Sequence, residues 1–348
     1  MQKIIFSKRL QEEIHELCTD IHPDRIFLLT DTTTERLCTP LVEDCPSLQQ
    51  APHIVIGATD THKNLDTLSL VWNALSTGQA SRRSLLINLG GGMVTDLGGF
   101  AAATFKRGID FVNIPTTLLA MVDAAVGGKT GINFNGLKNE IGAFRDSRAV
   151  VVDTEFLRTL DDLNLRSGYA EMLKHSLLKG HDMWADHLKF DLAHPDYAHL
   201  QELVAQSIQV KEDIVREDPH EHGLRKALNL GHTVGHAFEA LALEQGRAVL
   251  HGYAVAWGLL CELYLSAVHC HFPTQSMQQT VRFIRENYGP FAFTCEDYEH
   301  LHALMLHDKK NVGGEINFTL LANVGDIVLN QHLTKEDVFE SFDFFREG

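Results

Sequence analysis

Five short aliphatic runs, separated by helix-length segments, occupy the first 155 or so residues of this 348-residue chain and constrain its fold most strongly. The runs are "RIFLLTD" (25–31), "HIVIG" (53–57), "SLLINLG" (84–90), "DFVNIP" (110–115) and "RAVVVD" (148–153). Short runs that are apolar throughout are typical of parallel strands buried on both faces. We therefore expect this part of the chain to form a doubly wound α/β sheet.

After about residue 160 the strand-like runs give way to long helical periodicities. One late segment, "EINFTLLANVGDIVLN", predicts a hairpin that turns at Val324-Gly325-Asp326. Thr334 and Asp337 then form a capping signature for a final helix. The sequence thus predicts an α/β domain over residues 1–160 and a mostly helical domain over 161–348. No low-complexity linker separates them, so we expect them to pack closely around an active site.

The net charge of −16 argues against nucleic acid or an anionic membrane as a partner, because both attract basic surfaces. We expect no membrane helix, which needs about 18 apolar residues, and the start lacks a signal-peptide pattern. The six cysteines are scattered without a C-x-x-C motif. We expect reduced thiols in a cytoplasmic protein.

Gly90, Gly91 and Gly92 follow a predicted strand and precede a predicted helix. A dinucleotide pyrophosphate binds at such a turn, held by free N–H groups and the positive end of the helix. The fingerprint G-x-G-x-x-G is incomplete, because Thr95 occupies its third glycine position. The alternative is a tight strand-to-helix turn without a ligand.

A second glycine-rich segment, "MVDAAVGGKTGINFNGLKNEIGAF" (121–144), resembles the end of a phosphate-binding loop at Gly128-Lys129-Thr130. The motif G-x-x-x-x-G-K-[ST] requires glycine at position 123, where this chain has Asp123. This substitution disfavours a nucleotide triphosphatase. Lys129 and Lys138 remain candidates for contacts with an anion.

Three histidines in the helical half are candidates for a metal site. His232 and His236 are spaced i, i+4, which places both rings on one side of a helix, and His251 follows fifteen residues later. Catalytic zinc takes about three protein ligands. The sequence between the first two histidines lacks the glutamate of the H-E-x-x-H motif. Spacing alone does not say which two histidines would bind metal, and simple packing is the alternative.

Glu171 lies within the apolar pattern "YAEMLKHSLL" and is a candidate for the remaining ligand. A buried carboxylate is costly unless it is paired or bound to metal. Lys174 at i+3 and His175 at i+4 offer an alternative, in which Glu171 forms only a salt bridge.

Seven segments together resemble the 3-dehydroquinate synthase family, in the same order and from about residue 53 to residue 325. They are "GGGMVTDLGGFAAATFKRG", "IPTTLLAMVDAAVGGKTGIN", "LKNEIGAF", "SGYAEMLKHSLL", "GLRKALNLGHTVGHAFEA", "LHGYAVAWG" and "HDKK". The resemblance implies a Rossmann-like NAD-binding domain and a helical metal-binding domain. It also implies conversion of 3-deoxy-D-arabino-heptulosonate 7-phosphate to 3-dehydroquinate and phosphate, in the shikimate route to aromatic amino acids.

The resemblance implies a ligand set for zinc or cobalt, with His236 facing the substrate instead of the metal. The implied metal ligands are Glu171, His232 and His251. The implied NAD contacts are Asp60, Lys63, Gly92, Met93, Val94, Thr95, Asp96, Thr116, Thr117, Lys129, Lys138, Phe156, Leu157, Arg158 and Thr159.

The implied substrate contacts collect positive charge, which an acidic protein needs in order to bind a sugar carrying a phosphate and a carboxylate. They are Arg107, Asp123, Lys129, Lys138, Asn139, Lys174, Lys211, Arg225, Asn229, His236 and Lys309. Those with implied catalytic roles are Asp123, Lys129, Asn139, Lys174 and His236. Arg107 would act from the neighbouring subunit of a homodimer.

The implied reaction uses NAD transiently. NAD+ oxidises the C5 hydroxyl, phosphate leaves by elimination, NADH returns the hydride, and the opened ring closes in an aldol step. Two alternatives of similar architecture are another sugar phosphate cyclase and an NAD- and metal-dependent polyol dehydrogenase. A third is a binding module without catalysis.

Overall fold

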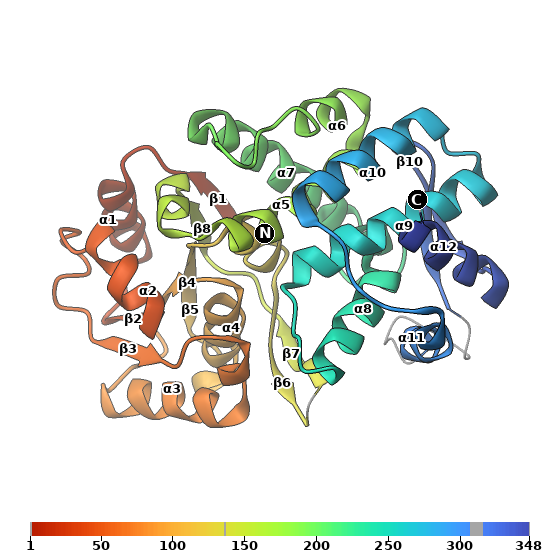
Figure 1. The fold of residues 1–348 in the computed structure, drawn as a ribbon. Coiled ribbons are helices and arrows are strands. Elements are labelled where there is room, and N and C mark those ends of the chain that lie inside the picture. The colour runs from red at the N-terminus through yellow and green to blue at the C-terminus, as the bar shows by residue number, and fades with distance from the viewer. Residues whose placement is uncertain (1, 136, 307–315, 348) are drawn as a thin grey trace. The chain divides into compact units, whose positions relative to one another are not determined.

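The computed structural model describes residues 2–135, 137–306 and 316–347. The chain divides into two compact units, Met1–Asp161 and Asp162–Gly348 (Figure 1). The sequence suggested a boundary after residue 160.

Unit 1 is built on a six-stranded sheet in which every neighbouring pair of strands is parallel. All five predicted strands form, which confirms the parallel α/β prediction. The first strand, β1, was not predicted; it lies at the edge of the sheet, where it pairs with β8. In spatial order the strands are β1 (Lys3–Phe6), β8 (Ala149–Val152), β5 (Asp110–Pro115), β4 (Leu85–Gly90), β2 (Ile26–Asp31) and β3 (His53–Ile56).

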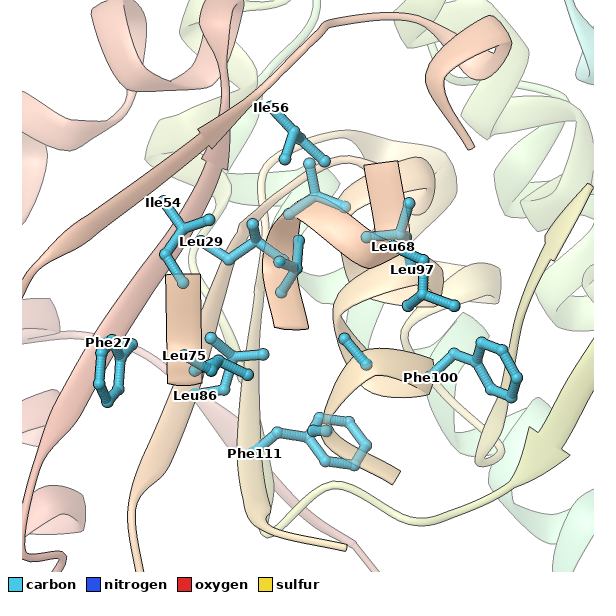
Figure 2. Close-up of a cluster of buried hydrophobic side chains, with 14 of the residues drawn as sticks. Phe27, Leu29, Ile54, Ile56, Leu68, Leu75, Leu86, Leu97, Phe100 and Phe111 are labelled. Atoms are coloured by element: carbon cyan, nitrogen blue, oxygen red, sulfur yellow. The ribbon is translucent and has the colours of Figure 1, made fainter. Parts of the chain in front are cut away.

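The described part of unit 1 also contains the α-helices α1 (Leu10–Ile21), α2 (Thr32–Leu37), α3 (Leu65–Thr77) and α4 (Gly92–Thr104). Figure 2 shows how apolar side chains of α3 and α4, such as Leu68 and Leu97, meet those of the strands, such as Leu29. Burying one such side chain contributes about 1.5–3 kcal/mol. This core fixes α4 against the sheet, and with it the glycine turn at the carboxyl end of β4.

A two-stranded antiparallel hairpin, β6 (Lys129–Phe134) and β7 (Leu137–Phe144), contacts α4. In a phosphate-binding loop the Gly-Lys-Thr segment opens a helix. Here Lys129 and Thr130 open strand β6 instead. The structure therefore agrees with the rejection of a nucleotide triphosphatase.

Unit 2 is mostly helical, and α9 lies at its centre, in contact with α5, α8, α10, α12 and β9. The predicted hairpin is confirmed as β9 and β10, and the Thr334–Asp337 capping box forms at the start of α12. The elements are α5 (Asp162–Lys179), α6 (His181–His187), α7 (Tyr197–Glu217), α8 (His232–Glu244), α9 (His251–Cys270), α10 (Thr274–Tyr288), α11 (Tyr298–Leu306), β9 (Phe318–Asn323), β10 (Asp326–Gln331) and α12 (Lys335–Glu347).

Helix α9 corrects one expectation, because by length and composition alone it is apolar enough to cross a membrane. Within its most apolar 18-residue window, 67% of the residues are buried inside the protein. Glu262 lies near its middle and accepts hydrogen bonds from the backbone N–H groups of Gly231, which precedes α8, and of Val234 in α8. Burial among the other helices accounts for the apolar composition of α9.

Candidate active site

The predicted NAD-binding segments of unit 1 follow the carboxyl ends of three adjacent strands. Gly92–Asp96 follows β4, Thr116 and Thr117 follow β5, and residues 156–159 follow β8. The strand order reverses between β4 and β2, so that later strands are added on the opposite side of the sheet. Ligands of open α/β sheets bind at the carboxyl ends of the strands beside such a reversal.

At this edge the glycine turn presents backbone N–H groups. Gly90 ends β4, Gly91 precedes α4, and a Cβ atom added to Gly91 would lie 3.1 Å from the Thr117 side chain. The Thr116 N–H donates to the Gly90 carbonyl at 3.0 Å, which ties the two strand ends together. The first N–H groups of a helix have no partner within it, and they carry the positive end of the helix dipole. The turn is therefore suited to hold a phosphate.

An acidic residue that we did not predict ends the neighbouring strand. Asp31 closes β2, and the β2–β4 register of Leu29 with Asn88 places it level with Gly90. Its carboxylate accepts from the N–H groups of Thr33 and Thr34. An acid near the glycine turn binds the ribose in dinucleotide-binding folds. The signal was present in the sequence as "TD" at the end of an apolar run.

Lys63, Asp96 and Asn139 come together from three separate segments. The Lys63 Nζ lies 2.5 Å from Asp96 Oδ2 and 2.5 Å from Asn139 Oδ1. Lys63 is only 5% exposed, so this pairing compensates the burial of its charge. The structure thereby joins two predicted NAD contacts to a predicted substrate contact.

The neighbouring predicted contacts are exposed. Asp60 accepts from the side-chain amide of Asn133 at 3.1 Å and lies 4.0 Å from the Lys138 ammonium. Lys129 is exposed at the start of β6, whereas Asp123 is half-buried in the short π-helix Ala120–Ala124.

The remaining predicted NAD and substrate contacts of unit 1 include both buried and exposed side chains. The side chains of Phe156, Leu157 and Val94 are fully buried, so these residues can offer a ligand only their backbone. Arg158 is exposed and pairs with a neighbouring glutamate. Arg107 is also exposed and has a left-handed backbone, with φ 70°.

In unit 2, Glu171, His232 and His251 come together from three helices. Glu171 lies within α5, and the two histidines are the first residues of α8 and α9. The Nε2 atoms of His232 and His251 lie 3.2 and 3.5 Å from Glu171 Oε1. One candidate ligand atom from each residue lies within 4.8 Å of the other two. The sequence alone does not show that these three residues lie together, whereas the structure does.

The Nδ1 atom of each imidazole is hydrogen-bonded to an oxygen atom of unit 2. His232 Nδ1 lies 3.1 Å from the Leu230 carbonyl, and His251 Nδ1 lies 3.3 Å from Glu239 Oε2. Because a carbonyl or carboxylate oxygen only accepts, Nδ1 carries the proton in each ring. A ring that has lost its Nε2 proton then has its lone pair on Nε2, facing Glu171. Metal-binding histidines are commonly oriented this way.

The spacing of the three groups fits a divalent ion. Ligand atoms bound tetrahedrally at about 2.1 Å from one zinc ion are separated by about 3.4 Å, close to the two distances above. Glu171 is fully buried, and its Oε1 faces the two imidazole Nε2 atoms without a further hydrogen bond among the described residues. Its other oxygen, Oε2, pairs with Lys174, as one of our alternatives predicted. Glu171 thus combines a salt bridge with an oxygen available to a metal.

The electrostatics also favour positive charge at this point. Burial raises the pKa of the Glu171 carboxyl, but Lys174 and His232 outweigh it and hold that pKa well below its usual value. Burial lowers the pKa of His251, whereas Glu171 and Glu239 on its two sides raise it to about 10. A proton on His251 and a divalent cation would compensate the same negative charges. Metal binding should therefore displace a proton.

His236 lies beside this cluster. Its ring centroid is 5.4 Å from that of His232 and 5.9 Å from that of His251. It also forms a second candidate group with Glu239 and His251, which does not include Glu171. Sequence reasoning did not select Glu239. His175, the other partner considered for Glu171, contacts Ser207 instead.

The predicted anion contacts of unit 2 include three buried cations, Lys174, Lys211 and Arg225. The short helix η6 (Leu224–Asn229) carries Arg225 and contacts α5 and α7. Asn229 donates to Glu221 at 3.1 Å, a further residue that we did not predict. The predicted contact Lys309 lies outside the described residues.

Two solved structures with a similar fold are cyclases. A 2-deoxy-scyllo-inosose synthase, complexed with carbaglucose-6-phosphate, NAD+ and Co2+, has a TM-score of 0.86 at 20% identity, covering 99% of this chain and 96% of its own. The 2-epi-5-epi-valiolone synthase of Streptomyces hygroscopicus, with NAD+ and Zn2+ bound, has a TM-score of 0.84 at 24% identity, covering 100% and 97%. The chain therefore shares the fold of these two enzymes.

The sequence matches one family within this fold. The family models for the 3-dehydroquinate synthase N-terminal and C-terminal domains match residues 53–167 and 168–311. The 3-dehydroquinate synthase of Parabacteroides distasonis is 55% identical over 347 residues, covering 100% of this chain and 98% of the relative. That of Leptospira interrogans is 39% identical, covering 90% and 86%. The chain belongs to the 3-dehydroquinate synthase family, as its motifs predicted.

Proposed function

We propose that this protein is an NAD- and metal-dependent carbon–oxygen lyase. It converts 3-deoxy-D-arabino-heptulosonate 7-phosphate to 3-dehydroquinate and phosphate. The observation that carries the proposal is the convergence of Glu171, His232 and His251 in a chain of this family. The arrangement supports zinc and cobalt alike.

Unit 1 would bind the dinucleotide at the carboxyl ends of its strands. The N–H groups at the start of α4 would hold the pyrophosphate, and Asp31 would accept from a ribose hydroxyl. Lys63 would hold Asp96 and Asn139 in place. The same carboxylate of Asp31 would repel a ribose phosphate, which favours NAD over NADP.

The three candidate ligands of unit 2 would hold the divalent ion. When bound, such an ion is a Lewis acid that makes a coordinated hydroxyl far more acidic. Lys174 stays beside Glu171 and compensates the buried carboxylate. The Leu230 carbonyl and Glu239 hold the two imidazole rings so that their Nε2 atoms face the Glu171 carboxylate.

The buried cations would bind the two anionic groups of the substrate. Arg225 suits bidentate binding of a carboxylate or phosphate, and Lys211 supplies a point charge. Asn229 is oriented by Glu221 and can donate or accept. We further propose a cytoplasmic homodimer in which Arg107 serves the active site of the second copy.

His236 would exchange a proton with the substrate instead of binding the metal. We therefore expect His236→Ala to keep one equivalent of metal while turnover falls about 10²–10⁴-fold, the usual contribution of a general acid or base. Elemental analysis and steady-state kinetics on the same preparation test this. Loss of metal from this variant would make His236 a ligand.

The overall proposal is tested by phosphate release from the heptulosonate phosphate, with and without NAD+ and a chelator. We expect release only when both NAD+ and metal are present, without accumulation of NADH. Restoring Zn2+ or Co2+ to the chelated protein should restore the activity.

Glucose 6-phosphate serves as the substrate control, because it has a phosphate but no carboxylate. Release from glucose 6-phosphate alone would favour another sugar phosphate cyclase. Stable formation of NADH without phosphate release would favour a polyol dehydrogenase. Either result contradicts the proposed reaction.

A further inference from the structure

The residue that precedes helix α8 does not cap the first N–H groups of the helix with a side chain. Gly231 precedes the helix with φ 79°, in the left-handed region that favours glycine. A Cβ atom there would lie 2.7 Å from the Leu259 side chain and 3.0 Å from the Val255 carbonyl. Glycine is thus required here, and it has no side chain with which to cap the first N–H groups of the helix.

Glu262, on α9, supplies this cap from another helix. The Gly231 N–H donates to Glu262 Oε2 at 2.5 Å, and the Val234 N–H donates to Oε1 at 3.1 Å. In an ordinary capping box these two N–H groups are satisfied by two side chains of the helix itself. Here one carboxylate accepts from both, and it is fully buried.

The two helices are close enough for this contact because of glycine. A Cβ atom on Gly258 would lie 2.0 Å from the Gly231 carbonyl oxygen and 2.6 Å from the Gly235 nitrogen. Gly258 is one turn before Glu262, so both lie on the same face of α9. The start of α8 is therefore in close contact with this face of α9, which fixes its position.

His232 lies between the two capped positions, as the first residue of α8. Glu262 therefore holds the backbone on both sides of it, while the Leu230 carbonyl holds its ring. We infer that Glu262 is a positioning residue that fixes His232 for metal binding. The inference rests on the proposed metal site.

Replacing Glu262 should change metal affinity through His232. In Glu262→Gln one oxygen is replaced by an NH2 group, which cannot accept from the second backbone N–H. We expect the dissociation constant for Zn2+ to rise about 10–100-fold, as is typical when the partners of metal ligands are removed. Competition with a chromophoric chelator measures it, and the Co2+ absorption spectrum should change as well.

Asp196→Ala is the control, because it removes a helix cap that lies away from the proposed metal ligands. The Asp196 carboxylate also accepts from two N–H groups at a helix start, those of Ala198 and His199 on α7. This variant should lower the melting temperature and leave the dissociation constant for Zn2+ within about twofold of wild type, since no proposed metal ligand is on α7. If Glu262→Gln likewise lowers only the melting temperature, Glu262 is a structural cap and the inference is wrong.

Hydrogen exchange of the wild-type protein tests the inference even if Glu262→Gln does not fold. The amides of residues 231–234 should be protected already in the metal-free protein, because Glu262 holds them before metal binds. Protection that arises only with Zn2+ would overturn the inference. Failure of wild type to bind Zn2+ or Co2+ would instead contradict the proposed function, so the two failures are distinguishable.

Discussion

Glu171→Gln is expected to lose its metal and to lower turnover by about 10³-fold or more. A neutral amide is a much weaker ligand than a carboxylate, and Lewis-acid stabilisation is worth several kcal/mol, where about 1.4 kcal/mol is tenfold in rate. The substitution also leaves the ammonium of Lys174, which is 1% exposed, without its carboxylate. Breaking a buried pair in this way costs about 3–5 kcal/mol, so the melting temperature should fall too.

The double variant Glu171→Gln/Lys174→Met separates these two effects. Removing both partners of a buried ion pair is often nearly neutral for stability. The double variant should therefore recover most of the melting temperature without recovering metal. Elemental analysis and thermal unfolding measure the two quantities on the same sample. Stoichiometric metal in the single variant would show that Glu171 is not a ligand.

The sequence predicted the sheet because its strands carry a strong local signal. Strands such as β4 and β5 are buried on both faces, so their residues are apolar throughout. The edge strand β1 has only four residues, of which two are exposed, and its pairing with β8 depends on residues about 146 positions away. Such pairing is not visible in a local pattern.

The β6–β7 hairpin was missed for a related reason. Nearly all of β7 is exposed, so it has neither a continuous apolar run nor a clear alternation. From the sequence we considered this segment for its resemblance to the end of a phosphate-binding loop, not as a hairpin. In the structure Gly142 lets the strands approach closely, since a Cβ atom there would lie 2.2 Å from the Thr130 carbonyl oxygen.

The candidate metal site was only partly readable from the sequence. Glu171 stood out as an acid in an apolar helix, and the spacing of His232 and His236 suggested a shared face. The selection of His251 over His236 came from the family resemblance, because it depends on how α8 and α9 pack. Glu262 carries the same signal as Glu171, a single acid in an apolar helix, but its partners are backbone groups that no sequence motif reveals.

Gly252→Ala is expected to disrupt the contact between α5 and α9 and to abolish metal binding. A Cβ atom at this position would lie 1.8 Å from the Ser167 carbonyl oxygen and 2.5 Å from its carbonyl carbon. Because these are backbone atoms, the helices must move apart. Glu171 is one turn beyond Ser167, and His251 directly precedes Gly252, so the movement should also separate these two candidate ligands.

The expected loss of stability from Gly252→Ala is about 3 kcal/mol or more, at or above the upper end for overpacked cores. For a unit of this size that corresponds to a fall of about 6–12 °C in melting temperature. Thermal unfolding with and without Zn2+ measures it, and the increase that Zn2+ gives wild type should be absent. The Glu171→Gln/Lys174→Met variant is the reference, since it should lose metal while keeping most of its stability. A Gly252→Ala protein with native melting temperature and metal content would mean that the α5–α9 approach does not set the spacing of the ligands.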